Sequence, residues 1–250
     1  MFSMNQTLIK LYFFLTQRSF YLKLKKNKLF VFIKSYVWKL VSKTRKDKLQ
    51  KYGYEFLEIF FNICEEVGVD AWIDWGTLLG FVRSGELIRY DDDLDIGIVA
   101  LSDEKHTLLI NSLYKHNLKK VREFKRNSIL ILESFSYKGI LLDVCYYIPN
   151  GQDLFCYMFK LGERTEIKYV KGIEHSIGYY SYKYIVKNEQ TEKVFFNNGC
   201  KCYVPQNAEN RVAKLYGDNW KIPCTDFNWE ELNNYIDEGY VENFTGWRKE

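Results

Sequence analysis

The sequence predicts an α+β protein, in which a sheet is flanked by helices. Residues 72–99 read as a strand, a Gly-Thr turn, a short helix and a second strand. Residues 121–149 read as three further strands separated by Lys and Gly positions. Apolar residues recur at helical spacing on either side of the first stretch, over residues 54–67 and 103–118.

Size and composition favour one folded domain with extensions. The chain has 250 residues, of which 47% are hydrophobic, and this is enough to bury a core. It contains 20 Tyr and 18 Phe but only three Pro, which argues against disorder over most of the length. We expect a basic amphipathic helical extension over residues 1–50, joined at a charged stretch over residues 43–51. The main domain then covers residues 51–225, and residues 226–250 form a tail that packs on it.

The cysteines favour a reducing compartment. The six of them show no paired CxxC spacing, and the single C-x-C at Cys200 and Cys202 is a weak metal motif. We interpret them as structural or incidental thiols. The front of the sequence lacks a signal-peptide pattern, and no apolar stretch of about 18 residues could span a bilayer. The expected location is therefore the cytoplasm, and the basic segment described next would place the protein at the inner face of the membrane.

Charge is distributed unevenly along the chain. The net charge is +4, yet residues 1–50 carry 12 Lys or Arg and one acid, Asp47. Residues 8–41 mix aromatic and apolar residues with Lys, so residues 1–45 could lie on an anionic membrane surface. The alternative is a helical prefix that packs on the domain with its lysines solvated. Nucleic acid is not expected as a partner, because the rest of the chain is acidic and carries no recognised binding motif.

Capping residues and glycines predict where the remaining helices begin and end. The helix over residues 54–67 ends before Gly68, which suits the position after a helix C-terminus. Ser102 or Asp103 is expected to cap the next long helix. Residues 151–187 are aromatic, basic and strand-like, and they could form one wall of an acceptor pocket. Asn207 is expected to cap a last helix that ends at Tyr216.

Aspartates in two separate segments suggest a metal site. Asp93 and Asp95 lie two apart in the apolar alternation LDIGIV, so on a strand both side chains leave the same face. Asp143 sits inside the apolar run ILLDVCYY, where an ionised carboxylate is costly unless it is paired or bound to a cation. A third acid on a neighbouring strand would complete a site for Mg²⁺, which prefers oxygen ligands.

A phosphate cradle is predicted before the acids. Gly76 and Thr77 begin the short helix, where backbone N–H groups and the positive helix end can meet an anion. Arg83 follows Gly76 by seven residues, about two turns, and should lie near the same face. A cradle that faces a metal-binding strand suits phosphoryl or nucleotidyl transfer. The alternative for Arg83 is a surface arginine.

The acidic run over residues 91–95 has two other possible interpretations. A lone acidic run is usually a solvated loop, but the strand pattern and the preceding turn disfavour that reading. An EF-hand starting at Asp91 is excluded, because its required Gly would fall on Ile96 and its required Glu on Ser102. We expect Asp91 and Asp92 to shape the loop or to support the metal ligands from outside. Asp74 is expected to hydrogen-bond in the turn, and no chemistry is assigned to it.

The motifs GTLLGFVR, DDDLDIGI, LLDV and VPQNAENRVAKLYGDNW together resemble the LicD family. This family includes bacterial phosphorylcholine transferases and is similar to fukutin and the fukutin-related ribitol-phosphate transferases. The resemblance covers about residues 52–225. It departs from the family at Arg89 and Tyr90, where Pro-Trp is common, and this difference bears on the loop shape and the choice of donor.

The resemblance implies a nucleotidyltransferase-like fold with a mixed sheet flanked by helices. It implies a metal-dependent phosphotransferase that moves a phosphorylated small alcohol from a CDP-linked donor to a sugar hydroxyl of a cell-surface glycan or its lipid-linked precursor. CMP would leave, and Mg²⁺ or Mn²⁺ would be required.

The family's site residues map onto this chain. Its metal-binding acids correspond to Asp93 and Asp95, with Asp143 as the third, and its donor-binding turn corresponds to Gly76 and Thr77. Asp143 is our candidate for the base that takes the acceptor's proton. Further candidates for the site are Asp92, Arg89 and His175, of which His175 reads also as an ordinary structural or surface histidine.

Two rival functions remain open on the sequence. A glycosyltransferase could use a D-x-D motif to hold a nucleotide-sugar diphosphate, although such enzymes normally place that motif after a longer nucleotide-binding half. A catalytically silent homologue could bind glycans or act as a scaffold, although the intact acids argue against it.

Overall fold

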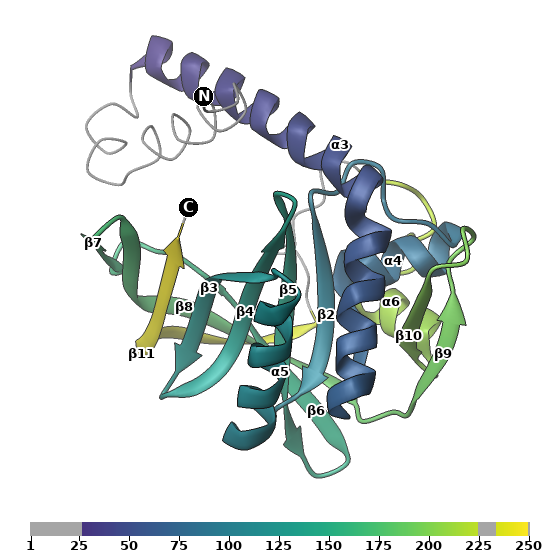
Figure 1. Cartoon of the computed structure of the whole chain (residues 1–250). Coiled ribbons are helices and arrows are strands. Elements are labelled where there is room, and N and C mark those ends of the chain that lie inside the picture. Colours follow the sequence, from purple (N-terminus) through teal and green to yellow (C-terminus); the bar gives the residue numbers. More distant parts are fainter. Residues whose placement is uncertain (1–26, 225–233, 250) are drawn as a thin grey trace.

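A computed structural model describes residues 27–224 and 234–249 of the chain (Figure 1). Its helices are α3 (Lys28–Val67), α4 (Trp75–Ser84), α5 (Asp103–Lys115) and α6 (Ala208–Tyr216). Its strands are β1 (Ala71–Ile73), β2 (Asp93–Val99), β3 (Lys119–Arg126), β4 (Ile129–Tyr137), β5 (Ile140–Asn150), β6 (Asp153–Lys160), β7 (Glu166–Val170), β8 (Ile173–Lys187), β9 (Thr191–Phe195), β10 (Lys201–Pro205) and β11 (Tyr235–Lys249). The protein is therefore α+β. Strands β1 to β8 fall in stretches that the sequence predicts as strands, whereas β9, β10 and β11 were not predicted.

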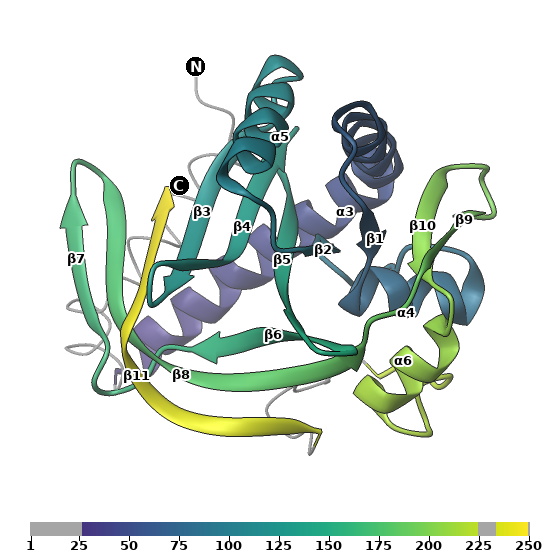
Figure 2. The same ribbon diagram turned by 90° about the horizontal axis from the view of Figure 1, so that it is seen from below.

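The main sheet is mixed and strongly curled. Its strands lie in the order β1-β2-β5-β4-β3-β11-β8-β6, with β7 paired to β8, while β9 and β10 form a separate two-stranded sheet. β2 and β5 run parallel, and the other pairings among the described strands are antiparallel. Because β6 pairs with both β8 and the end of β5, the sheet turns back on itself (Figure 2).

β2 and β5 each have one apolar face and one polar face. The apolar face, which packs in the main core, carries Leu94, Ile96 and Ile98 of β2 and Leu142, Val144 and Tyr146 of β5. Helices α3 and α5 cover this face with Phe56, Phe60, Leu109 and Leu113. Since side chains alternate along a strand, the aspartates leave the opposite face. In Figure 2, β6 and α6 lie on one side of these strands and α5 on the other.

Helix α3 is much longer than the pattern over residues 54–67 predicts. It is continuous for 40 residues, from the N-cap Asn27, whose side chain accepts from the N–H of Phe30, to Gly68, which adopts the left-handed conformation as predicted. The predicted boundary at residues 43–51 lies inside this helix, because that stretch contains good helix formers and neither Gly nor Pro. Of the predicted basic extension over residues 1–50, the part before position 27 lies outside the described residues.

The C-terminal segment, expected as a packing tail, supplies a strand of the sheet. β11 pairs with both β3 and β8. Phe244 of β11 is fully buried with Ile131 and Tyr179 in a second core inside the curl of the sheet. This half of the molecule therefore depends on a pairing between segments that are distant in the sequence.

The last helix differs from its predicted capping in one detail. Asn207 stands at the N-cap position of α6, but its side chain makes no cap hydrogen bond. Its amide nitrogen instead donates to Glu189 Oε1 over 2.7 Å. A tertiary partner has replaced the local one.

Over the described part of the chain, no helix combines the length and the apolar character that crossing a membrane would need.

Candidate functional site

The parallel pairing of β2 and β5 brings three of the predicted acids to one place. The register sets Asp95 beside Asp143 and Asp93 beside Leu141, so all three carboxylates leave the same face. They line one pocket of about 850 Å³. Asp93, Asp95 and Asp143 are therefore neighbours in space, although 48 positions separate the last two in the numbering.

Asp91 belongs to the same pocket, which sequence reasoning missed. It lines the pocket with the other three acids, and its Oδ2 lies so close to Gly76 that a Cβ there would be 2.6 Å away. Asp92 does not line the pocket, but carboxylate oxygens of Asp91, Asp92 and Asp93 lie within 4.8 Å of one another. The N–H of Asp92 donates to Asp91 Oδ1, and its Oδ2 lies 3.6 Å from Arg45 Nη1. The sequence spacing could have indicated this, because Asp91, Asp93 and Asp95 lie two residues apart, and side chains at that spacing on an extended chain leave the same face.

The start of α4 is tied directly to the acids. The N–H of Gly76 donates to Asp95 Oδ2 over 3.1 Å, and the Thr77 hydroxyl accepts from the N–H of Asp95 over 2.8 Å. Thr77 is buried and does not line the pocket, whereas Gly76 does. A Cβ at Gly76 would lie 2.6 Å from Asp91 Oδ2 and 3.3 Å from Asp95 Oδ2, so a side chain there would displace the carboxylates. These contacts fix the Asp95 carboxylate at the positive end of the helix.

The oxygens in this pocket fit a divalent cation. Among the described residues, no donor lies within hydrogen-bond geometry of the buried Asp143 Oδ1, although the neighbouring Ser134 hydroxyl acts to lower the pKa of this carboxyl. Asp143 Oδ2 lies 4.0 Å from Arg122 Nη1. A buried carboxylate oxygen without a donor is costly unless a cation takes the donor's place. A set of carboxylates is the ligand chemistry of Mg²⁺ and Mn²⁺.

The carboxylates also destabilise one another in their charged forms. Burial, followed by the charges of Asp143 and Asp91, raises the pKa of Asp93 well above its usual range. Burial and then the charge of Asp93 do the same to the pKa of Asp95. Burial raises the pKa of Asp91 to about 6. Burial also raises the pKa of Asp143, and the positive charge of Arg122 partly offsets this increase. A bound cation would relieve this repulsion.

Asp74 has a larger part than a turn residue. It caps α4 by accepting from the N–H of Trp75, and its Oδ2 accepts from Trp72 Nε1, Tyr147 OH and Arg211 Nη2 at 3.1, 2.7 and 2.9 Å. Asp74 and Arg211 are both buried. The ion pair joins the start of α4 to α6, and the Tyr147 hydrogen bond joins it to β5. The residue spacing gave no sign that Arg211 would reach Asp74.

Arg83 lines the pocket, but most of its hydrogen bonds go to other residues of the pocket lining. Its Nε and Nη2 donate to the carbonyl oxygen of Trp220 at 3.0 and 2.6 Å, and its Nη1 lies 3.3 Å from Tyr90 OH. An arginine has five N–H groups, so part of its donor capacity remains for a ligand. Arg83 thus anchors the segment after α6 at the edge of the pocket.

Two further candidates from the sequence lie away from the pocket. Arg89 is exposed in the loop before β2, and it does not line the pocket. His175 is exposed on β8, where it lies opposite Trp247 of β11 and Lys168 of β7. The structure brings neither of them to the acids.

Aromatic side chains form much of the remaining wall. They come from the start of α4, the loop before β2, strand β6 and the region of α6: Trp75, Tyr90, Tyr157, Phe159, Tyr216 and Trp220. The predicted aromatic half of the chain thus contributes through β6. Rings of this kind suit stacking on a planar base or packing on a sugar.

The crowded acids make the metal-free protein sensitive to pH. Each raised pKa means that the folded state binds more protons than the unfolded state between about pH 4 and the raised value, so stability falls as pH rises through that window. In EDTA, the melting temperature should therefore be lower at about pH 8 than at about pH 5, and Asp95→Asn should reduce this difference. Thermal melting monitored by circular dichroism measures both. An unchanged pH dependence in the variant would show that Asp95 does not share the repulsion.

The buried ion pair gives a second prediction. Arg211→Met leaves the Asp74 carboxylate buried without its cation, which should lower the free energy of unfolding by about 3–5 kcal/mol. Lys214→Met, at an exposed position of the same helix, is the matched control and should cost under about 1 kcal/mol. Urea denaturation compares the two variants with the natural chain. Equal losses would mean that the ion pair contributes nothing beyond helix packing.

Comparisons with known proteins agree with the motifs. Residues 68–171 match the family model described as LicD/FKTN/FKRP, nucleotidyltransferase domain. The protein of Mus musculus called "Ribitol-5-phosphate transferase FKTN" is 23% identical over 182 residues, which are 72% of this chain and 36% of the mouse protein. The Homo sapiens protein of the same name is 24% identical with the same coverage.

A shorter match comes from a bacterium. "Uncharacterized protein RP689" of Rickettsia prowazekii (strain Madrid E) is 42% identical over 53 residues, 21% of this chain and 20% of that protein. The chain spans little more than a third of the length of the FKTN relatives, 36%. The matched region contains the strand with the acids and Asp143. Residues 68–171 therefore match a LicD-family domain, and the chain is related in sequence to the FKTN proteins.

Proposed function

We propose that this protein is a metal-dependent phosphotransferase on a nucleotidyltransferase-like fold. It moves a phosphorylated small alcohol, such as phosphocholine or ribitol phosphate, from a CDP-linked donor to a hydroxyl group of a cell-surface glycan or its lipid-linked precursor, and it releases CMP. The observation that carries the proposal is the meeting of Asp93, Asp95 and Asp143 in one pocket beside the start of α4. The FKTN relatives are named as ribitol-5-phosphate transferases, which supports the reaction class.

Asp93, Asp95 and Asp143, with Asp91 beside them, would hold Mg²⁺ or Mn²⁺. The unpartnered Oδ1 of Asp143 and the mutual repulsion of the acids support this assignment. Such an ion, when bound, neutralises charge on the donor's phosphates.

The protein's own groups position the reactants. The Gly76 N–H holds the Asp95 carboxylate. Arg83 lines the pocket, where a phosphate oxygen could accept from its remaining N–H groups. The aromatic rings at Trp75, Tyr90 and Trp220 would pack on the nucleotide or on the acceptor sugar and exclude water.

The transfer itself is a displacement at phosphorus. The acceptor's hydroxyl oxygen forms a bond to the phosphorus that carries the alcohol, and the bond from this phosphorus to the CMP oxygen breaks, so that CMP leaves with the electron pair. Asp143 is our candidate to take the hydroxyl proton, because burial raises its pKa and one of its oxygens has no donor. Arg122, beside its other oxygen, would hold the side chain in place.

CMP release from defined donors tests the proposal. Purified protein is supplied with CDP-choline, CDP-ribitol or CDP-glycerol and a glycan acceptor, and one donor should give CMP and a phosphodiester in the presence of Mg²⁺. Asp93→Asn and Asp95→Asn should each lower kcat by about 100-fold or more, because they remove charge from the metal site. EDTA should have the same effect, and added Mg²⁺ should reverse it.

Asp153→Asn is the matched control, since Asp153 lies outside the pocket lining and pairs with the exposed Lys187. It should keep the natural rate. Normal turnover in an Asp93→Asn, Asp95→Asn double variant would end the proposal. A new glycosidic bond together with a nucleoside diphosphate would identify a glycosyltransferase, and a protein that binds a glycan without turnover would be a silent homologue.

A further inference from the structure

The first half of α3, Lys28–Lys43, which we call the arm, extends beyond the sheet. Figure 1 shows the arm leaving the body at the upper edge, while the second half of the helix packs along β2 and α5. At about 1.5 Å per residue the arm is about 24 Å long. It is therefore long enough to form a binding surface of its own.

One face of the arm is apolar and exposed. Leu29, Phe32, Ile33 and Tyr36 have exposed fractions of 66, 66, 40 and 57%. Their spacing of three and four residues places them on the same side of the helix. Phe30, Val37 and Val41, on another side, are buried. Contiguous exposed apolar side chains of this kind mark an interaction surface.

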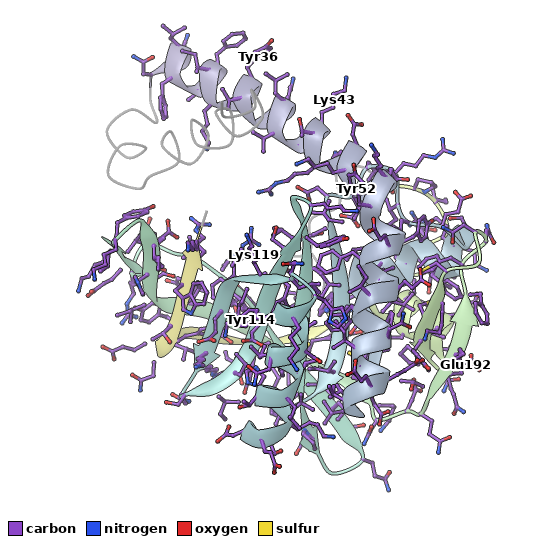
Figure 3. The ribbon with its side chains drawn as sticks, viewed as in Figure 1. Tyr36, Lys43, Tyr52, Tyr114, Lys119 and Glu192 are labelled. Carbon is purple, nitrogen blue, oxygen red and sulfur yellow. The ribbon has the colours of Figure 1, made fainter. Side chains whose placement is uncertain are left out.

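Basic side chains border this apolar face. Lys28, Lys39 and Lys43 are exposed, and Figure 3 shows Tyr36 and Lys43 projecting on the same side of the helix, away from the sheet. Between Lys28 and Lys48 the chain has seven Lys or Arg and one acid, Asp47. The surface is thus both apolar and strongly basic.

This combination selects one class of partner. An anionic bilayer surface offers acyl chains to the apolar residues and phosphate groups to the lysines. Docking a second copy of the arm would bring lysines against lysines, and nucleic acid would leave the apolar side chains exposed. We propose that the arm lies in the surface of an anionic membrane, with Leu29, Phe32 and Tyr36 inserted and Lys39 and Lys43 at the lipid phosphates.

The arm joins the body beside the acidic pocket. Two residues after the arm, Arg45 pairs with Asp92, and further along the helix Gln50 Nε2 donates to the carbonyl of Ile88 over 3.2 Å. Both contacts are to the loop that leads into β2. A membrane-bound arm would therefore hold the pocket close to the lipid surface, where a lipid-linked acceptor would lie. Membrane binding by itself requires no catalysis, so it stands independently of the proposed function.

Sedimentation with vesicles tests the arm. The full chain, without donor or metal, is mixed with vesicles of phosphatidylcholine alone or with about one-third phosphatidylglycerol. It should bind the anionic vesicles and release them at high salt. Two variants of the arm should each weaken binding by about tenfold or more. The first combines Lys28→Glu, Lys39→Glu and Lys43→Glu, and the second combines Phe32→Ser and Tyr36→Ser.

The matched controls carry the same chemical changes elsewhere on the surface. Lys168→Glu, Lys187→Glu, Lys193→Glu together change the net charge equally, and Phe195→Ser with Ile129→Ser removes exposed apolar residues from β9 and β4. Both controls should bind vesicles like the natural chain. Equal binding to neutral and anionic vesicles, or equal losses in the arm variants and the controls, would overturn the proposal. So would a dimer in light scattering that Phe32→Ser with Tyr36→Ser dissociates, because a second copy would then cover the face.

Discussion

The parallel pairing of β2 with β5 is the constraint on which the site depends. It forces Asp95 and Asp143 side by side and sets Asp93 one step away, although burial and like charge oppose their ionised forms. The core residues on the opposite faces of the same strands, covered by α3 and α5, supply the favourable free energy that holds them together. Stability on one face of the sheet therefore supports an unfavourable arrangement on the other, as functional sites commonly require.

Local patterns were enough to predict most of the elements and the three central acids. The period of two in LDIGIV and ILLDVCYY placed Asp93, Asp95 and Asp143 on polar faces of buried strands, and the glycine-bearing turn placed Gly76 beside them. These signals are local because a strand's alternation and a helix cap involve only neighbouring residues. Their roles in binding and catalysis remain predictions that the experiments above address.

What the sequence did not show depends on contacts between distant segments. Nothing in the spacing could pair Asp74 with Arg211, direct Arg83 to the Trp220 carbonyl or give Asn207 a partner in Glu189. The length of α3 was missed for another reason: the apolar pattern changes where the helix leaves the core, although helix propensity continues. His175 and Arg89 were plausible by residue type alone, and the topology places them elsewhere.

The position of β11 has a kinetic consequence. β3, β4 and β5 follow one another in antiparallel order and can pair through short turns, but the second core is incomplete until β11 enters between β3 and β8. Closing so large a loop costs chain entropy, and this cost arises before the contacts of Phe244 can stabilise the closed form. During synthesis on the ribosome, the inner surface of the curled sheet thus stays open until the residues of β11 emerge, and that interval is when the nascent chain most needs protection from aggregation.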